Sequence, residues 1–337
     1  MVVPCYNYGH YLPDAVHSVL GQHGVDLEVI IVDDCSTDGS AAVAADLAAA
    51  HPAVRLVRNP VNLRHIATYN AGLAQTTGDY VVLLSADDML APGSLARAVA
   101  LMEHRPEVVL VYGGVSTFAT APPPAPAQPR TWSTWKGRDW VARSCRSASN
   151  LIVNPEAVLR RSTLEQLGGY DPAFPHAADM LLWLRAAVLG DVGRVNGTQA
   201  YYREHGTNMH RTDYSGTLRD LQEKARVLEA FLGPDGEGGG LSEAPELRTA
   251  ARRTLAREAV RYAVHERDSP DGGEAAAAAA LADFATSTWP GIEDTSLWRA
   301  HRARARGPVP PWRARAARTA FGLRWRLRWY RRQRWGT

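Results

Sequence analysis

The chain has 337 residues and a net charge of +3, and its 45% of hydrophobic and 22% of charged residues are typical of a globular protein with one large or two ordinary domains. No apolar run reaches the ~18–20 residues that span a bilayer, and the N-terminus lacks the basic and apolar segments of a secretion signal. Three widely spaced cysteines exclude a disulfide framework and a zinc site made of cysteines alone, so we expect a cytoplasmic protein.

Short apolar runs alternate with helix-forming segments in the first part of the chain. The runs predict strands at the first residues up to Pro4, at Leu27–Val32, at Val54–Arg58 and at Tyr80–Leu84. The predicted helices between them are Pro13–Gln22, a segment ending near Ala50, and Ala67–Gln75. This alternation predicts an α/β fold with a parallel or mixed sheet flanked by helices. The first strand looks short, which leaves open a start upstream of Met1, and no G-x-G-x-x-G follows a strand, which disfavours a dinucleotide-binding oxidoreductase.

The middle of the chain continues the pattern and then becomes helical. We expect strands at Val108–Tyr112 and Asn150–Val153, and helices at Pro92–His104, Arg161–Leu167, Met180–Leu189 and Thr217–Leu232. Asp179 is the expected N-cap of the buried helix that follows it. A glycine-rich linker and two further helices between about Glu243 and Asp283 complete a helical extension.

Two pairs of adjacent carboxylates follow the second and fourth predicted strands: Asp33-Asp34 and Asp87-Asp88. In open α/β sheets, ligands bind beyond the carboxyl ends of the strands, so these acids lie where chemistry is expected. Adjacent carboxylates repel each other unless a cation lies between them, and a divalent ion with its phosphate ligand is a common solution. Taken alone, Asp87-Asp88 fits such an ion site and the cap of a helix starting near Pro92 equally well.

Residues 301–337 contain twelve arginines and no acidic residue, so the rest of the chain is net acidic. With 3.6 residues per turn, one apolar stripe of a helix here would contain Trp312, Ala316, Ala320, Leu323, Leu327 and Tyr330. A basic amphipathic helix with tryptophans is typical of segments that bind an anionic membrane surface, which we expect of residues 312–335. Docking on the chain's own acidic body stays an alternative, and nucleic acid is disfavoured.

Several short motifs occur in a specific order over residues 1–215. They are Pro4-Cys5-Tyr6-Asn7, Asp33-Asp34-Cys35-Ser36-Thr37-Asp38-Gly39, Asn70-Ala71-Gly72 followed by Gly78-Asp79-Tyr80, Ala86-Asp87-Asp88, Gly168-Gly169-Tyr170-Asp171, Ala178-Asp179 ahead of Leu182-Trp183-Leu184-Arg185, and Tyr202-Arg203-Glu204-His205-Gly206. This order resembles the family 2 glycosyltransferases of the GT-A fold. The resemblance implies a half that binds a nucleotide sugar at residues 1–90 and an acceptor-side half at 91–215. The helical extension at 216–300 and the basic tail at 301–337 lie outside it.

The resemblance also implies roles for individual residues. The donor would contact Pro4, Tyr6, Asn7, Asp34 and Asp87, with Tyr6 packing on the base, Asp34 accepting from a base N–H and Asp87 holding the ribose. Asp88 would ligate Mg²⁺ or Mn²⁺ on the diphosphate. His205 matches a position that completes the metal shell in similar enzymes, although an ordinary loop histidine is the alternative.

The resemblance assigns Asp179 the role of general base, with a helix cap as its alternative. After Asn62 the chain departs from the family pattern, and we expect Arg64 or His65 to supply a cation near the phosphates. The frequent acids two positions before Asp87 and one before Asp179 are Ser85 and Ala178 here.

We therefore expect an inverting glycosyltransferase that moves a sugar from a UDP-, GDP- or dTDP-sugar to a hydroxyl of a glycan, a lipid-linked or a small-molecule acceptor. It would be cytoplasmic, or peripheral at the inner face of the cytoplasmic membrane. The rival interpretation is a nucleotide-binding or signalling α/β module without turnover. The absence of any lysine before Lys136 argues against a phospho-receiver domain, and the four acids Asp34, Asp87, Asp88 and Asp179 argue against a degenerate transferase.

Overall fold

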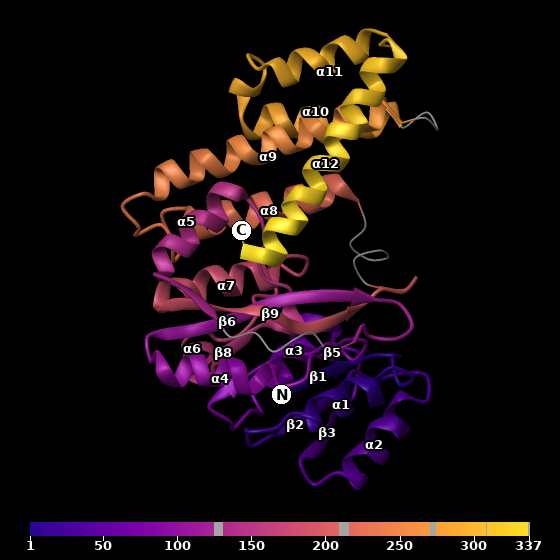
Figure 1. Ribbon diagram of the computed structural model, residues 1–337, viewed down its shortest axis with the longest axis vertical. Helices are drawn as coiled ribbons and strands as arrows, with labels where there is room; N and C mark the ends of the chain where they lie inside the picture. The colour runs from indigo at the N-terminus through magenta and orange to yellow at the C-terminus, as the bar shows by residue number, and fades with distance from the viewer. Residues whose placement is uncertain (125–130, 209–215, 270–273, 308, 336–337) are drawn as a thin grey trace. The chain divides into compact units, whose positions relative to one another are not determined.

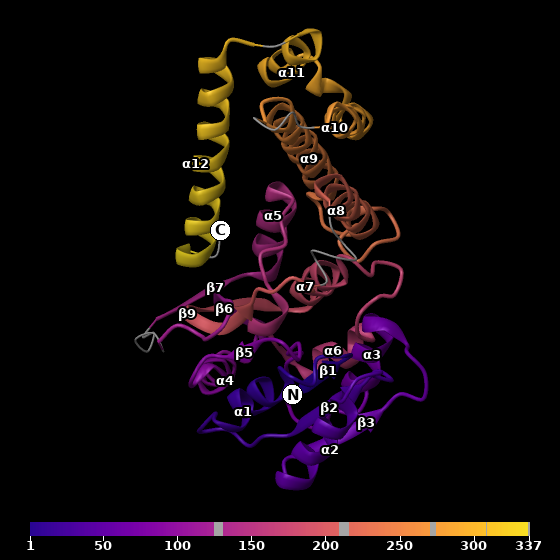
Figure 2. The same ribbon diagram turned by 90° about the vertical axis from the view of Figure 1, so that its right-hand side faces the viewer.

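The computed structural model describes residues 1–124, 131–208, 216–269, 274–307 and 309–335 (Figures 1 and 2). The chain divides into two compact units. The first comprises residues 1–141 and 150–206, and the second comprises residues 142–149 and 207–332. The proline- and alanine-rich sequence of residues 119–130 predicts a loop, and part of it lies outside the described residues. The predicted four-part division of the chain stays a prediction.

The first unit begins with a parallel three-stranded sheet in the order β1-β2-β3. Its strands are β1 (Val2–Cys5), β2 (Val29–Asp33) and β3 (Val54–Arg58). The helices that alternate with them are α1 (Leu12–Leu20), α2 (Ser40–Ala50) and α3 (Arg64–Leu73). Every residue of β2 is buried, as expected for a central strand covered on both faces. The predicted βαβ pattern is confirmed.

A second, mixed sheet has the strand order β4-β8-β6-β9-β5, with β7 paired to β9. Its strands are β4 (Tyr80–Val81), β5 (Met89–Leu90), β6 (Val108–Phe118), β7 (Trp132–Trp135), β8 (Val158–Arg160) and β9 (Asp191–Arg203). The predicted strand Tyr80–Leu84 is only partly a ladder strand, because β4 ends at Val81. Beyond it, Val2 donates to the carbonyl of Val82 and Leu84 donates to the carbonyl of Val2, both at 2.9 Å. This parallel bridge joins the two sheets.

The helices of the first unit beyond α3 are α4 (Ser94–His104), the 3₁₀ turn η1 (Asn154–Glu156), α6 (Arg161–Leu167) and α7 (Ala178–Leu189), while α5 (Gly137–Ser147) runs from the first unit into the second. The prediction of a strand at Asn150–Val153 is wrong, because these residues have no strand partner. Leu151 and Ile152 are nevertheless buried, so their apolar character reflects burial in the core and not membership of a sheet.

The second unit is helical. It contains α8 (Thr217–Leu232), α9 (Ala244–Arg267), α10 (Ala275–Thr288), the turn η2 (Pro290–Ile292), α11 (Ser296–Arg306) and α12 (Pro311–Trp335), the last belonging to it as far as Arg332. Phe231 of α8 and Leu255 and Val260 of α9 are fully or almost fully buried. The predicted helix Thr217–Leu232 and the two that follow the linker are confirmed. No helix in the described part of the chain is both long and apolar enough to cross a membrane.

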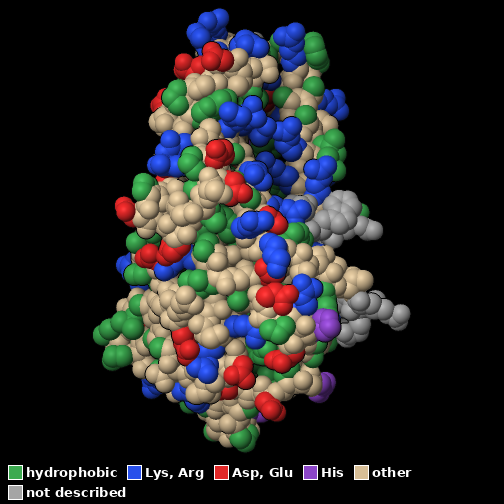
Figure 3. All heavy atoms as spheres, turned by 90° about the vertical axis from the view of Figure 1, so that its left-hand side faces the viewer, with side chains coloured by type: hydrophobic (Ala, Val, Ile, Leu, Met, Phe, Trp, Pro, Cys, Tyr) green, Lys and Arg blue, Asp and Glu red, His purple; other side chains and the backbone are tan. Residues whose placement is uncertain are grey.

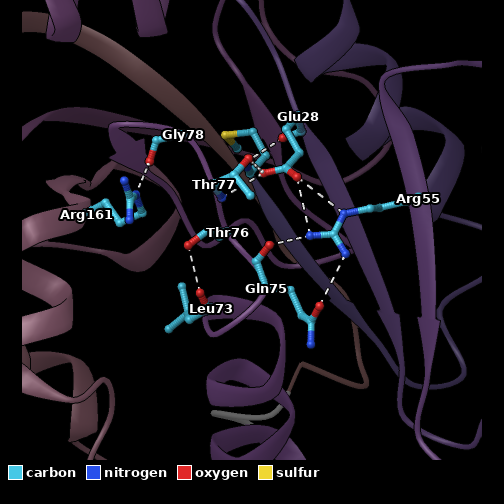
Figure 4. A network of polar contacts seen from close by, with 9 residues as sticks. Glu28, Arg55, Leu73, Gln75, Thr76, Thr77, Gly78 and Arg161 are labelled. Atoms are coloured by element: carbon cyan, nitrogen blue, oxygen red, sulfur yellow. Dashed lines mark hydrogen bonds and ion pairs between the residues drawn. The ribbon is translucent and has the colours of Figure 1, made fainter.

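A polar network fixes the loop that leads into β4 (Figure 4). The carboxylate of Glu28, just before β2, accepts from the backbone N–H of Thr77 at 3.1 Å and from its hydroxyl at 3.2 Å. Arg55 of β3 donates to the same carboxylate at 3.3 Å and to the carbonyl of Gln75. Burial raises the pKa of Glu28, but the hydrogen bonds from Thr77 and the charge of Arg55 outweigh burial, and the net pKa lies below its usual value.

Replacing Glu28 by glutamine is expected to lower the free energy of unfolding by up to about 1 kcal/mol near pH 7, because the pair with Arg55 is partly exposed. A carboxyl whose pKa is lowered by folding stabilises the protein above its ordinary pKa of 4.5, and that contribution is lost as the pH falls through the folded-state pKa. Urea unfolding at about pH 7 and about pH 3 measures it. If wild type and Glu28→Gln differed in free energy of unfolding by the same amount at both pH values, the stabilisation would not come from the charged carboxylate of Glu28.

Candidate active site

The carboxyl ends of β1, β2 and the segment 82–84 lie at one edge of the joined sheets, because these segments run parallel. Tyr6 and Asn7 follow β1, Asp34 follows β2, and Asp87 and Asp88 follow the third segment. Polar groups from three neighbouring strands are therefore gathered at the edge where open α/β sheets bind ligands.

Asn7 joins two of these strand ends. Its backbone has a φ of 59°, which the short polar side chain of asparagine tolerates. The side-chain oxygen accepts from the backbone N–H of Thr37 at 2.8 Å, and the backbone N–H of Asn7 donates to the hydroxyl of Ser36 at 3.1 Å. Asn7 thus fixes the loop after β1 to the loop after β2. Next to it, Tyr6 is 45% exposed, while Pro4 is half-buried within β1.

Asp34 is buried and holds the start of α3. Its Oδ1 accepts from the side-chain amide of Asn59 and from the backbone N–H of Leu63, both at 2.8 Å. Asn59 also donates to the hydroxyl of Thr68 at 3.2 Å. No residue in the described ranges donates a hydrogen bond to Oδ2 of Asp34. One oxygen of this carboxylate therefore positions the loop, and the other is left to accept from a ligand.

Asp87 is paired with His205, which lies two residues beyond β9. Oδ2 of Asp87 lies 2.9 Å from Nε2 of His205, and both side chains are about nine-tenths buried. The imidazole also contacts the rings of Tyr8 and Tyr11, with centroids 5.4 and 5.0 Å apart. The residues predicted to hold the ribose and the metal are thus in direct contact.

Asp88 is almost fully buried and accepts through Oδ1 from the backbone N–H of Arg203 at 2.9 Å. Burial and, next in size, the charge of Asp87 raise the pKa of Asp88 well above its usual value, while Arg203 acts in the opposite direction. A cation placed beside the two carboxylates would offset their repulsion and favour the ionised form of Asp88.

Arg203 contacts both residues of the Asp87–Asp88 pair, a role that the sequence did not reveal. Its guanidinium lies over the rings of Tyr11 and Phe118, 4.6 and 4.5 Å from their centroids. It donates to the carbonyl of Asp87 and to the carboxylate of Asp14, both at 2.8 Å. The only signal in the sequence was its place two residues before His205 in the same motif.

Asp179 is the second residue of α7 and not its N-cap, which is Ala177, so the cap interpretation is wrong. Its Oδ2 accepts from the side-chain amide of Asn150 at 2.7 Å and its Oδ1 from the backbone N–H of Met180 at 2.7 Å. Burial and then the charge of Asp179 raise the pKa of Tyr170 well above its usual value. Asn150 therefore contacts this carboxylate directly, and Tyr170 lies within reach of its charge.

Helix α3 connects the surroundings of Asp34 and Asp179. Its start is bound by Asp34, and the side chain of Asn70 pairs with the backbone of Tyr170 in both directions, at 2.8 and 2.9 Å. Gly169 has a φ of 89°, and a Cβ there would come within 2.5 Å of the Asn70 side chain. Gly169 of the predicted motif thus allows the backbone before Asp179 to lie close to the Asn70 side chain.

Arg64 begins α3 with a φ of 65°, which strains the backbone of a residue that has a Cβ. Its backbone N–H donates to the side chain of Asn62 at 2.9 Å, and the residue is exposed. The neighbouring His65 instead contacts the carbonyl of Pro175 at 2.9 Å. Of the two cations predicted for the phosphates, Arg64 is therefore the more accessible one.

The acid pair fits a divalent cation that is shared with a ligand. No three His, Cys, Asp or Glu side chains in the described residues form a group that could enclose a metal ion. Mg²⁺ is commonly bound by one or two carboxylates and completed by substrate phosphates and water, so a full protein cage is not needed. Asp88 could supply the carboxylate ligand, and His205, which pairs with Asp87, could supply a ring nitrogen.

Comparison with known proteins identifies the family. Residues 1–167 match the family model described as Glycosyl transferase family 2. An uncharacterized glycosyltransferase from Nostoc sp. is 30% identical over 238 residues, which cover 68% of this chain and 71% of that protein. The chain belongs to glycosyl transferase family 2. It is therefore a glycosyltransferase, and the assignment from its motifs is confirmed.

Two solved structures share the fold of this glycosyltransferase. S. aureus TarS residues 1–349 in complex with UDP-GlcNAc aligns with a TM-score of 0.60 at 15% identity, covering 96% of this chain and 90% of that one. The mannosyltransferase PcManGT of Pyrobaculum calidifontis, in complex with GDP-Man and Mn²⁺, aligns with a TM-score of 0.51 at 23% identity, covering 90% and 84%. The predicted GT-A-like fold is confirmed.

Proposed function

We propose that the enzyme transfers a sugar from a nucleotide-diphospho-sugar to an acceptor hydroxyl with inversion at the anomeric carbon, using a divalent metal. The observation that carries the proposal is the Asp87–Asp88 pair at the carboxyl edge of the sheet, where burial and mutual repulsion raise the pKa of Asp88. Such a pair favours a bound cation, and the diphosphate of a nucleotide sugar supplies the remaining oxygens. The complexes of TarS with UDP-GlcNAc and of PcManGT with GDP-Man and Mn²⁺ support this ligand class.

On the donor side, each part of the nucleotide has a partner. The exposed ring of Tyr6 offers a surface for the base, and Oδ2 of Asp34 accepts from a base N–H, while Pro4 and Asn7 shape the loop between them. Asp87 accepts from the ribose hydroxyls. The metal, held by Asp88 with His205, would act as a Lewis acid that stabilises charge on the leaving diphosphate. Arg64 adds a positive charge near the phosphates.

On the acceptor side, Asp179 is the general base. As the acceptor oxygen attacks the anomeric carbon from the face opposite the diphosphate, Asp179 takes the hydroxyl proton and the bond from carbon to the leaving phosphate oxygen breaks. The amide of Asn150 fixes the orientation of the carboxylate through its 2.7 Å hydrogen bond. Asn150 is thus a positioning residue that acts through Asp179.

A donor panel tests the proposal. UDP-, GDP- and dTDP-sugars are each incubated with the full chain and Mn²⁺ or Mg²⁺, with and without EDTA, and the released nucleoside diphosphate is measured. We expect release from at least one donor and its loss with EDTA. Metal-dependent binding of nucleotide without release from any donor would favour the non-catalytic nucleotide-binding alternative, and metal-independent release would overturn the role of the cation.

Replacing Asp34 by asparagine is expected to weaken binding of the nucleoside diphosphate by about 10- to 100-fold, because an NH₂ group then meets the base N–H where Oδ2 accepted it. The remaining side-chain oxygen can still accept from Leu63, so the loop keeps its main contact. Calorimetric titration measures the affinity, and the thermal midpoint serves as the folding control. Wild-type affinity in a folded variant would remove Asp34 from the base-binding site.

A further inference from the structure

Helix α12 contacts α9 through one face. The ring of Phe321 lies 4.3 Å from that of His265 and 5.2 Å from that of Tyr262, between centroids. On the same side, Arg318 donates to the carbonyl of Asp268 at 2.6 Å, and Arg328 to the carboxylate of Glu258 at 2.8 Å. These contacts define the inner face of α12.

The apolar stripe of α12 lies on the opposite face. Trp312 and Tyr330 each lie about two and a half turns from Phe321, so they project from the other side of the helix. Along this outer face, which we define as Trp312, Leu323, Leu327 and Tyr330, the exposed fractions run from 50 to 67%. The contacts with Tyr262, His265 and Glu258 dock α12 on α9 through the inner face, as the docking alternative predicted, and they leave the outer face exposed.

Arginines line both sides of the outer face, and residues 301–337 contain no acid to compensate them. Figure 3 shows basic side chains gathered on the helical unit. The inner side is already crowded with positive charge. Burial, and then the charges of Arg324 and Arg328, lower the pKa of Arg261 on α9 to about 10. The unit thus carries an excess of positive charge around an exposed apolar strip.

We propose that the outer face of α12 docks on the surface of a bilayer that contains anionic phospholipids, with the helix lying in the plane of the interface. Aromatic and leucine side chains enter the boundary between headgroups and acyl chains, and the flanking arginines pair with lipid phosphates. One feature favours lipid over nucleic acid: the outer face exposes the leucine side chains of Leu323 and Leu327, which acyl chains can bury but bases cannot stack on. An orientation in the plane of the interface agrees with the finding that no helix among the described residues, α12 included, is both long and apolar enough to cross a bilayer.

Vesicle sedimentation of the full chain tests the proposal. The probes are vesicles of phosphatidylcholine alone and of phosphatidylcholine with about a third phosphatidylglycerol. We expect binding to the anionic vesicles, at least about tenfold weaker binding to the neutral ones, and loss of binding as salt is raised. Equal binding to both vesicle types, or binding to neither, would overturn the proposal.

The double variant Leu323→Ser and Leu327→Ser is expected to weaken binding to anionic vesicles by at least about tenfold. Both side chains are half or more exposed, so the folded core is not disturbed, and circular dichroism checks this. Trp132→Ser is the matched control: it removes an exposed hydrophobic side chain from β7 and should leave vesicle binding unchanged.

Two other partners give distinct results. If the outer face joins two copies of the chain, sedimentation equilibrium will show an oligomer that the double variant dissociates, and vesicles will not compete. If the arginines bind nucleic acid, an oligonucleotide will be retained equally by wild type and double variant. Either result overturns the proposal. Donor hydrolysis without vesicles should be the same in wild type and double variant, so the proposed activity is tested separately.

Discussion

Replacing Asp179 by asparagine is expected to lower the rate constant for sugar transfer by about a thousandfold, within the 10²–10⁴-fold range that a general base contributes. The amide has nearly the shape of the carboxylate but cannot take the proton of the acceptor hydroxyl. Asp34, Asp87 and Asp88, which are proposed to hold the donor, are untouched. Donor affinity should therefore stay within about threefold of wild type. Initial rates and calorimetric titration of the nucleoside diphosphate measure the two quantities.

Two further variants separate proton transfer from damage to the fold. Asp171→Asn makes the same change in the preceding loop, where Asp171 accepts from the backbone N–H of Ala173 at 2.9 Å, and it should leave the rate within about twofold. Asn150→Ala removes the 2.7 Å hydrogen bond to Asp179 and should lower kcat by about tenfold with little change in donor KM. A thousandfold loss in Asp171→Asn, or wild-type turnover in Asp179→Asn, would remove Asp179 from the mechanism.

The sequence predicted those parts of the fold that depend on local patterns. Val54–Arg58, Arg161–Leu167 and Thr217–Leu232 match β3, α6 and α8 in both ends, because alternating or 3.6-residue periodicity is encoded within each segment. Strand β9 was not predicted. Its residues include Gly193, Asn196 and Gly197, which disfavour strands, and they adopt one because β6 and β7 pair with β9 on its two sides.

The site was predictable to the same extent. The carboxylates follow strands and occur in a characteristic order, so their positions could be read along the chain. Asn150, Arg203 and the pairing of Asn70 with Tyr170 could not, since each acts on a residue that is distant in sequence. The contact between Asp87 and His205 spans 118 residues, and that between Asn70 and Tyr170 spans 100. Such contacts between residues distant in sequence are set by tertiary packing, which a single sequence does not reveal.

Replacing Asp88 by asparagine is expected to have opposite effects on activity and on stability. The rate of transfer should fall by about 10²–10³-fold, because the variant loses the carboxylate proposed to hold the cation that stabilises charge on the leaving diphosphate. The metal-free protein should instead become more stable near pH 7, because the buried carboxylate is replaced by a neutral amide. The carbonyl of the new amide can still accept from the backbone N–H of Arg203, so the turn is kept.

The sign of the stability change follows from the raised pKa of Asp88. A carboxyl whose pKa is raised by folding stabilises the folded protein at pH values below its ordinary pKa of 3.8. That stabilisation is lost as the pH rises through the folded-state pKa. The stabilisation by asparagine should therefore vanish near about pH 3 and grow toward neutral pH. Thermal unfolding in EDTA at several pH values measures it, and adding Mn²⁺ with a nucleoside diphosphate should raise the midpoint of wild type only.

Asp14→Asn is the control for this change, because it weakens another contact of Arg203, at 2.8 Å, while the acid pair stays intact. It should lower the rate by less than about tenfold and leave the pH dependence of stability close to wild type. If Asp88→Asn destabilised the metal-free protein near pH 7 as it lost activity, Asp88 would be a structural acid supporting the turn. A gain in stability together with the loss of turnover is what a carboxylate kept for a cation requires, since its burial is unfavourable until the cation binds.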